Sequence, residues 1–81
     1  MKNLNLKELR PKWVEVQSGM ISDVYYDEDA EVLYVMFKGG TVWAYFNVTI
    51  EENESMMEAP SIGKYFGKVI KADKDGIEID E

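Results

Sequence analysis

The feature that most constrains the fold is a pair of β-forming runs on either side of Gly39-Gly40, in a chain of 81 residues. Residues 32–38 and 41–48 are rich in β-branched and aromatic residues, which favour strands. Adjacent glycines between such runs are typical of a hairpin turn, because glycine adopts positive φ without steric cost. A third run at residues 20–26 leads into an acidic turn at 27–30. The sequence therefore predicts a three-stranded antiparallel meander.

The register of the hairpin decides which side chains share a face of the sheet. A two-residue turn puts Trp43 and Tyr45 on the face of Tyr34. A three-residue loop instead puts both beside Val35 and Phe37. Both faces are apolar in either register. We expect helices to cover one face, which leaves the other for the N-terminal segment, a second copy of the chain or a partner.

Two helices are predicted after the meander. Thr49-Ile50-Glu51-Glu52 fits a capping box, and Pro60 ends the helix that it begins. Ser61 caps a second helix, in which apolar residues recur at helical spacing on one face and Lys64, Lys68 and Lys71 lie on another. We expect close backbone packing at Gly63 and Gly67, since glycine is costly inside a helix.

The predicted fold class is α+β: a small antiparallel three-stranded meander packed by two C-terminal helices. Residues 13–16 and 77–80 alternate apolar and polar residues, so they are candidates for short edge strands that would extend the meander. We divide the chain into an N-terminal arm at 1–12, a folded domain at 13–72 and an acidic C-terminal turn with a short strand or tail at 73–81.

The composition argues against an enzyme. The chain has no histidine and no cysteine, which removes the usual general base, nucleophile pairs and zinc ligands. We therefore predict no catalytic residue, metal or cofactor, and catalysis by carboxylates alone ranks third among the functional hypotheses. Asp73-Lys74-Asp75-Gly76 indicates a turn, since the calcium-loop pattern is incomplete. No apolar run is long enough to span a membrane. We expect a cytoplasmic protein, or one in the host cytoplasm if a phage encodes it.

The net charge of −7 is unevenly spread. Residues 1–12 carry four bases and one acid, and residues 64–71 carry three bases and no acid. Residues 13–63 carry ten acids and one base, and residues 72–81 carry five acids and one base. The negative total opposes the approach of nucleic acid and favours basic partners, whereas the lysines at 64–71 form a local positive stripe.

The ordered motifs of residues 18–66 resemble the KTSC domain, a short module at the C-terminus of some lysyl-tRNA synthetases and a free-standing bacterial or phage protein. The resemblance rests on Ser18, Ile21, Val24, Tyr26-Asp27, Leu33, Val35, Phe37, Gly40, Trp43-Ala44-Tyr45, Val48, Ala59, Ser61 and Gly63-Lys64-Tyr65-Phe66. Trp43 replaces the first tyrosine of the family's central Tyr-x-Tyr motif. Gly67 stands where the family usually has asparagine, and Thr49 where it usually has proline.

The resemblance implies a non-catalytic binding module, with RNA or tRNA as the ligand. The candidate surface combines aromatic side chains, on which bases stack, with lysines that contact phosphates: Tyr34, Lys38, Trp43, Tyr45, Lys64, Lys68 and Lys71. The alternative is an acidic protein-interaction module, such as a phage-encoded factor that binds a basic host protein through Glu51, Glu52 and Glu54. Self-association through the second sheet face is a further hypothesis, which Tyr34→Glu tests.

Overall fold

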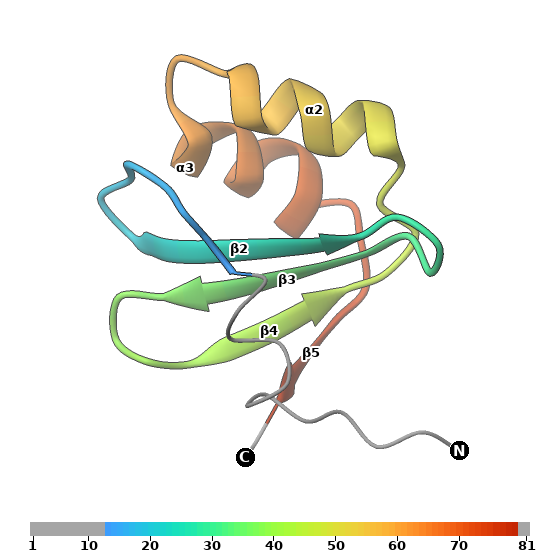
Figure 1. Cartoon of the computed structure of the whole chain (residues 1–81), viewed down its shortest axis with the longest axis horizontal. Coiled ribbons are helices and arrows are strands. Elements are labelled where there is room, and N and C mark those ends of the chain that lie inside the picture. The colour runs from blue at the N-terminus through green and yellow to red at the C-terminus, as the bar shows by residue number, and fades with distance from the viewer. Residues whose placement is uncertain (1–12, 80–81) are drawn as a thin grey trace.

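The computed structural model describes residues 13–79, and the predicted arm at 1–12 and the last two residues lie outside this range. The described elements, in chain order, are β1 (Val14–Glu15), β2 (Ile21–Asp27), β3 (Val32–Phe37), β4 (Val42–Tyr45), α2 (Ile50–Glu58), α3 (Ile62–Tyr65), the π-helix η2 (Phe66–Lys71) and β5 (Gly76–Ile79). The sheet lies on one side of the molecule and the helices lie together over one of its faces (Figure 1).

The described sheet is a meander of five antiparallel strands in the order β1-β2-β3-β4-β5. The predicted three-stranded core is present as β2, β3 and β4. Both predicted edge strands also form, so the sheet is wider than the core alone. Strand β1 pairs with β2 over two residues, and β5 pairs with β4 along its whole length. The fold class is α+β, as predicted from the β-forming runs and the two helical segments that follow them.

The β3–β4 hairpin closes with a three-residue loop, so the two-residue alternative is wrong. The backbone N–H of Phe37 donates to the Thr41 carbonyl at 2.9 Å, and that of Gly40 donates to the Phe37 carbonyl at 2.9 Å. Gly40 has a φ of 100°, the left-handed conformation that the last loop position requires. Trp43 consequently pairs with Val35, and both project from the face that the helices cover.

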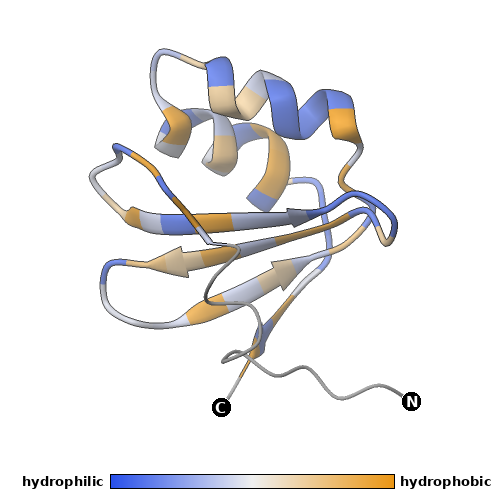
Figure 2. Ribbon diagram, in the orientation of Figure 1, coloured by the Kyte–Doolittle hydropathy of each residue, from blue (hydrophilic) through white to orange (hydrophobic). Residues whose placement is uncertain are grey.

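The main core lies between this face and the helices. Side chains of β2, β3 and β4 pack there against Met56 of α2 and against Phe66 and Ile70 of η2, all of which are fully buried. The ring of Phe66 meets those of Phe37 and Tyr45 edge to face, with centroids 5.7 and 5.2 Å apart. Strand β3 consists of apolar and aromatic residues alone, whereas α2 is mostly hydrophilic (Figure 2). Helix α2 therefore contributes little apolar surface to the core apart from Met56.

The second face of the sheet carries a smaller apolar cluster. Val32, Tyr34 and Ala44 are buried there, with Trp13, Tyr25, Phe46 and Ile79 packed around them. The rings of Tyr25 and Tyr34 stack at 5.6 Å with an interplanar angle of 15°. Self-association through this face stays a prediction.

The first helix begins and ends as the sequence predicts. The Thr49 hydroxyl accepts from the backbone N–H of Glu52 at 3.1 Å, and the Glu52 carboxylate accepts from that of Thr49 at 2.9 Å. This is the predicted capping box. The Ser61 hydroxyl caps the next helix by accepting from the Lys64 N–H at 3.2 Å.

The second helix departs from the prediction because its α-helical turn, α3, continues as the π-helix η2. A π-helix has a wider turn, with hydrogen bonds from i to i+5, so it changes the angular spacing of side chains. Phe66 and Ile70 remain buried. Gly63 has the expected close neighbours, since a Cβ there would lie 3.1 Å from the Ser18 hydroxyl. Gly67 has open space instead, so the expectation of close packing there was wrong.

Candidate ligand-binding groove

An aromatic pair on β4 forms the floor of the candidate site. Trp43 and Tyr45 project from the helix-covered face, and their rings stack with centroids 6.1 Å apart and an interplanar angle of 19°. Tyr45 is buried, with only 4% of its surface exposed, whereas Trp43 is half-buried. Burial raises the pKa of the Tyr45 hydroxyl, which therefore stays protonated at neutral pH. The pair is buried at Tyr45 and partly accessible at Trp43.

These two rings border an open groove of about 470 Å³ between the sheet and the end of η2. The groove is lined by Met20, Phe37, Trp43, Tyr45, Lys71, Lys74 and Gly76. Gly76 lies opposite Tyr45 in the β4–β5 pair, and a Cβ on Gly76 would lie 2.5 Å from the Tyr45 ring. The ring thus lies over the glycine of the neighbouring strand, a packing that compensates for the missing side chain.

Two lysines supply positive charge to the groove. The Lys74 ammonium lies 3.0 Å from a carboxylate oxygen of Glu52 and is only 14% exposed, so its charge is largely neutralised. Lys71 is exposed and has no ion pair among the described residues. Lys71 is therefore the cation that an anionic ligand in the groove would meet first.

The structure brings together only part of the predicted aromatic and basic surface. Trp43, Tyr45 and Lys71 line one groove, as the hypothesis of a stacking platform with a basic rim requires. Tyr34 does not join them, because it lies in the cluster on the second face. Lys38 is exposed in the β3–β4 loop and does not line this groove.

The other two lysines of the predicted stripe line a separate groove of about 360 Å³. Lys64 and Lys68 border it together with Ala59, Pro60, Ser61, Tyr65 and Val69. The prediction assumed regular α-helical spacing, which would align Lys71 with Lys64. The π-helix begins between them and changes that alignment.

Phe37, Met20, Lys74 and Gly76 also line the main groove, although sequence reasoning did not select them as site residues. Gly76 and Lys74 were interpreted as parts of a turn. Their place in the groove depends on the pairing of β5 with β4, which a local pattern does not reveal. Phe37 was predicted only to share a face of the sheet with Val35, and its ring also meets that of Phe66.

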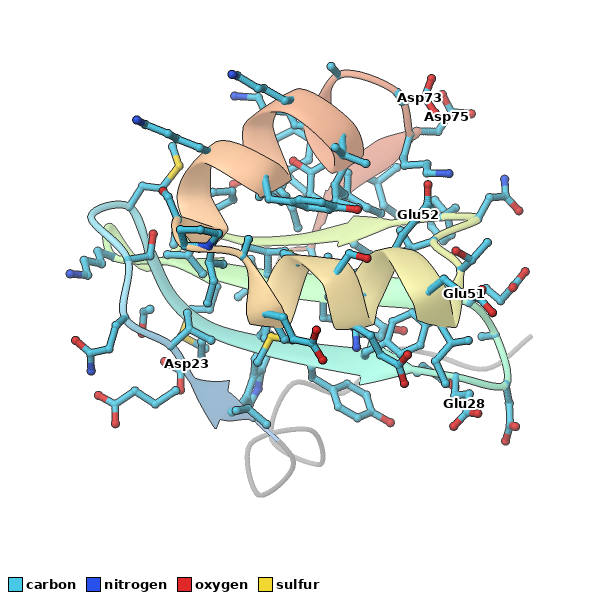
Figure 3. All side chains as sticks on the ribbon, turned by 90° about the horizontal axis from the view of Figure 1, so that it is seen from above. Asp23, Glu28, Glu51, Glu52, Asp73 and Asp75 are labelled. Carbon is cyan, nitrogen blue, oxygen red and sulfur yellow. The ribbon has the colours of Figure 1, made fainter. Side chains whose placement is uncertain are left out.

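The acidic candidates also separate in the structure. Glu52 closes the capping box and pairs with Lys74, and its side chain is 25% exposed. The Thr49 N–H that donates to the Glu52 carboxylate lowers the pKa of that group, and Lys74 acts in the same direction against the effect of burial. Glu51 and Glu54 are exposed on α2. Figure 3 shows Glu51 and Glu28 at the same end of the molecule.

Residues 13–79 contain no group of three or more acidic side chains placed to hold a metal ion. In the same range, no helix is long and apolar enough to cross a membrane. The segment 73–75 is a turn before β5, as predicted, and the Phe46 N–H donates to the Asp75 carbonyl there at 2.9 Å.

The fold and groove define a class of small α+β modules in which a meander sheet carries its helices on one face. The KTSC domain pattern matches residues 17–73, and the chain belongs to this family. A KTSC domain protein from Yersinia pestis has a similar structure, with a TM-score of 0.78 and 29% identity over 84% of this chain and 96% of that one.

Relatives of known sequence fall into two kinds. An uncharacterized protein of Stutzerimonas stutzeri (strain A1501) is 33% identical over 60 residues, which cover 74% of this chain and 84% of that protein. A lysine–tRNA ligase of Trichormus variabilis is 34% identical over 55 residues, and one of Nostoc punctiforme is 33% identical over 55 residues. These cover 68% of this chain but only 10% of each ligase.

Several residues of the family pattern serve the fold itself. The Ser18 hydroxyl accepts from the backbone N–H groups of Met20 and Ile21, both at 3.3 Å. Gly63 leaves room for that hydroxyl. The Tyr26 hydroxyl donates to the Val48 carbonyl at 2.6 Å, which ties β2 to the segment before α2. Trp43, by contrast, is the half-buried aromatic residue of the central motif and borders the groove.

Proposed function

We propose that the domain is a non-catalytic binding module that binds single-stranded RNA, including unpaired segments of tRNA, in the groove beside Trp43. One observation carries this proposal: the stacked pair Trp43–Tyr45 presents Trp43 to an open groove that the exposed Lys71 also lines. An unstacked base fits against an aromatic face, and an ammonium next to that face can meet the phosphate of the same or the next nucleotide.

The relatives support the choice of ligand. A segment of two lysine–tRNA ligases is similar to this chain, and those enzymes act on tRNA as their names state. The charge of the chain limits the strength of binding, since ten acids lie within residues 13–63. We expect weak binding that depends strongly on salt, because each phosphate contact releases counterions.

The two tryptophans allow a direct test, because they lie in different clusters: Trp13 on the second face and Trp43 in the groove. The Trp13→Phe variant leaves Trp43 as the fluorophore, and Trp43→Phe leaves Trp13. Short single-stranded RNA, and then total tRNA, is added to each variant at low salt. We expect quenching in Trp13→Phe, where the base stacks on Trp43, and little change in Trp43→Phe.

Affinity measurements complete the test. Stacking contributes about 1–3 kcal/mol per base, so Trp43→Ala should weaken binding by roughly fivefold to 150-fold. Lys71→Glu should also weaken binding. It should reduce the steepness of the plot of log K against log salt concentration by about 0.7, because one phosphate contact is lost. Lys38→Glu, which makes the same charge change outside the groove, should have a smaller effect. Equal quenching of both tryptophans, or equal losses from the two lysine variants, would contradict the proposal.

A further inference from the structure

A third groove, of about 380 Å³, lies between the outer part of the sheet and α2. Its apolar lining comes from Val14 and Val24 on the strands and from Ile50 and Met57 on α2. Val14 is 50% exposed and Met57 is 36% exposed, so two large apolar side chains face solvent across the groove. Exposed apolar side chains that converge on a concave surface indicate a place where a partner's apolar group can be buried.

The rim of this groove is acidic. Glu28, from the β2–β3 turn, and Glu54, on α2, both line it. The local field is negative beyond these two groups. Burial is the main cause of the raised pKa of the Tyr26 hydroxyl in the groove wall, and nearby carboxylates raise it further, in the order Glu31, Glu28, Glu51 and Glu52. The acidic side chains of the turn and of the start of α2 therefore act on the same region.

No cation balances this rim within the strands and helix that build it. Lys38 is the one base of residues 13–63, and the β3–β4 loop that holds it lies at the opposite end of the sheet from Glu28. Asn53 also lines the groove. The groove thus combines an apolar floor with negative charge on its rim.

We infer that this groove docks a basic amphipathic peptide segment of a partner protein. One apolar side chain of the segment packs between Val14 and Met57, and flanking lysine or arginine side chains reach Glu28 and Glu54. The apolar floor gives a small free cation nothing to pack against, and the acidic rim repels nucleic acid. The inference does not depend on the RNA proposal, because the two grooves share no lining residue.

A short capped peptide of alternating lysine and leucine is the probe. It is titrated into the labelled full-length protein at low salt, and amide shifts are followed. We expect saturable shifts at Val14, Glu28 and Met57 and none at Trp43. A lysine–serine peptide tests charge alone, and a glutamate–leucine peptide tests apolar contact alone. Both should bind at least about tenfold more weakly, since each lacks one of the two required features.

Matched variants separate the groove from general electrostatics. Glu54→Lys and Glu58→Lys make the same charge change on α2, but only Glu54 lines the groove. We expect Glu54→Lys to weaken binding about fivefold to tenfold and Glu58→Lys less than twofold. Met57→Ala should weaken binding severalfold. Met20→Ala, at an exposed methionine of the groove beside Trp43, should not weaken it.

Four results would overturn the inference: no shifts at low salt, equal losses from the two glutamate variants, equal binding of the lysine–serine peptide, or groove shifts that appear on raising protein concentration without peptide. The last result would assign the surface to a second copy of the chain. All four substituted side chains are exposed, and peptide-free spectra of each variant check that the fold is retained.

Discussion

Gly76→Ala tests whether the Tyr45 ring is as tightly held as the structure indicates. A Cβ at residue 76 would lie 2.5 Å from Cε1 and 2.7 Å from Cδ1 of that ring. The ring has little freedom to withdraw, because it is buried and stands between Phe66, at a centroid distance of 5.2 Å, and Trp43, at 6.1 Å. Either the ring or strand β5 must shift, and each shift disturbs the core or the β4–β5 pairing.

The expected loss can be worked out from two opposing effects. Overpacking of a buried site costs about 1–3 kcal/mol. The alanine also reduces the freedom of the unfolded chain, which offsets the cost by about 0.4–1 kcal/mol. We expect Gly76→Ala to lower the free energy of unfolding by about 1–2 kcal/mol. In urea titrations followed by circular dichroism, the midpoint should fall while the slope stays unchanged.

Gly67→Ala is the matched control, since a Cβ there meets nothing within 4 Å. It should raise the free energy of unfolding by about 0.4–1 kcal/mol. A double-mutant cycle then locates the clash. Tyr45→Leu removes the ring atoms that the new Cβ meets, so Gly76→Ala should cost little in that background. If Gly76→Ala were as harmless as Gly67→Ala in the wild-type background, the argument for a fixed ring would be refuted.

Two further predictions concern hydrogen bonds at the start of α2. Tyr26→Phe removes the donor to the Val48 carbonyl and leaves that buried group unpaired, so urea unfolding should show a loss of about 1–3 kcal/mol. The second prediction concerns Glu52, whose pKa is lowered by the N–H of Thr49 with help from Lys74. The stability that this carboxylate adds is fully present above its unfolded-state pKa. It is lost as the pH falls through the lowered pKa of the folded state. The wild type should therefore exceed Glu52→Gln in stability most at neutral pH and least in acid; a constant difference would contradict this account.

Local chemistry was the part of the fold that the sequence allowed us to predict. Thr49 and Glu52 form the capping box because both partners lie within four residues of each other. Ser61 caps its helix for the same reason. The meander also followed from runs of β-forming residues and from turns that join neighbouring strands. Each of these features depends on residues close together in the chain.

The remaining features depend on packing between distant residues. Gly39-Gly40 permits either hairpin loop, and the observed register buries Tyr45 against Phe66, a contact that a local pattern does not reveal. The π-helix likewise departs from the α-helical period on which the lysine stripe was predicted. Of the residues predicted for the aromatic and basic surface, only Trp43, Tyr45 and Lys71 consequently line the candidate groove.

The order of the strands has a consequence for how the domain folds. Strands β1 to β4 each pair with a neighbour in the chain, so these contacts close short loops and form rapidly. The β4–β5 pair instead joins Tyr45 to Gly76 across a segment that contains all the described helices, which makes its closure entropically slower. The groove beside Trp43 is lined by residues of both β4 and β5. It therefore takes shape only once the C-terminal strand has docked, and a ligand held there would slow the departure of that strand.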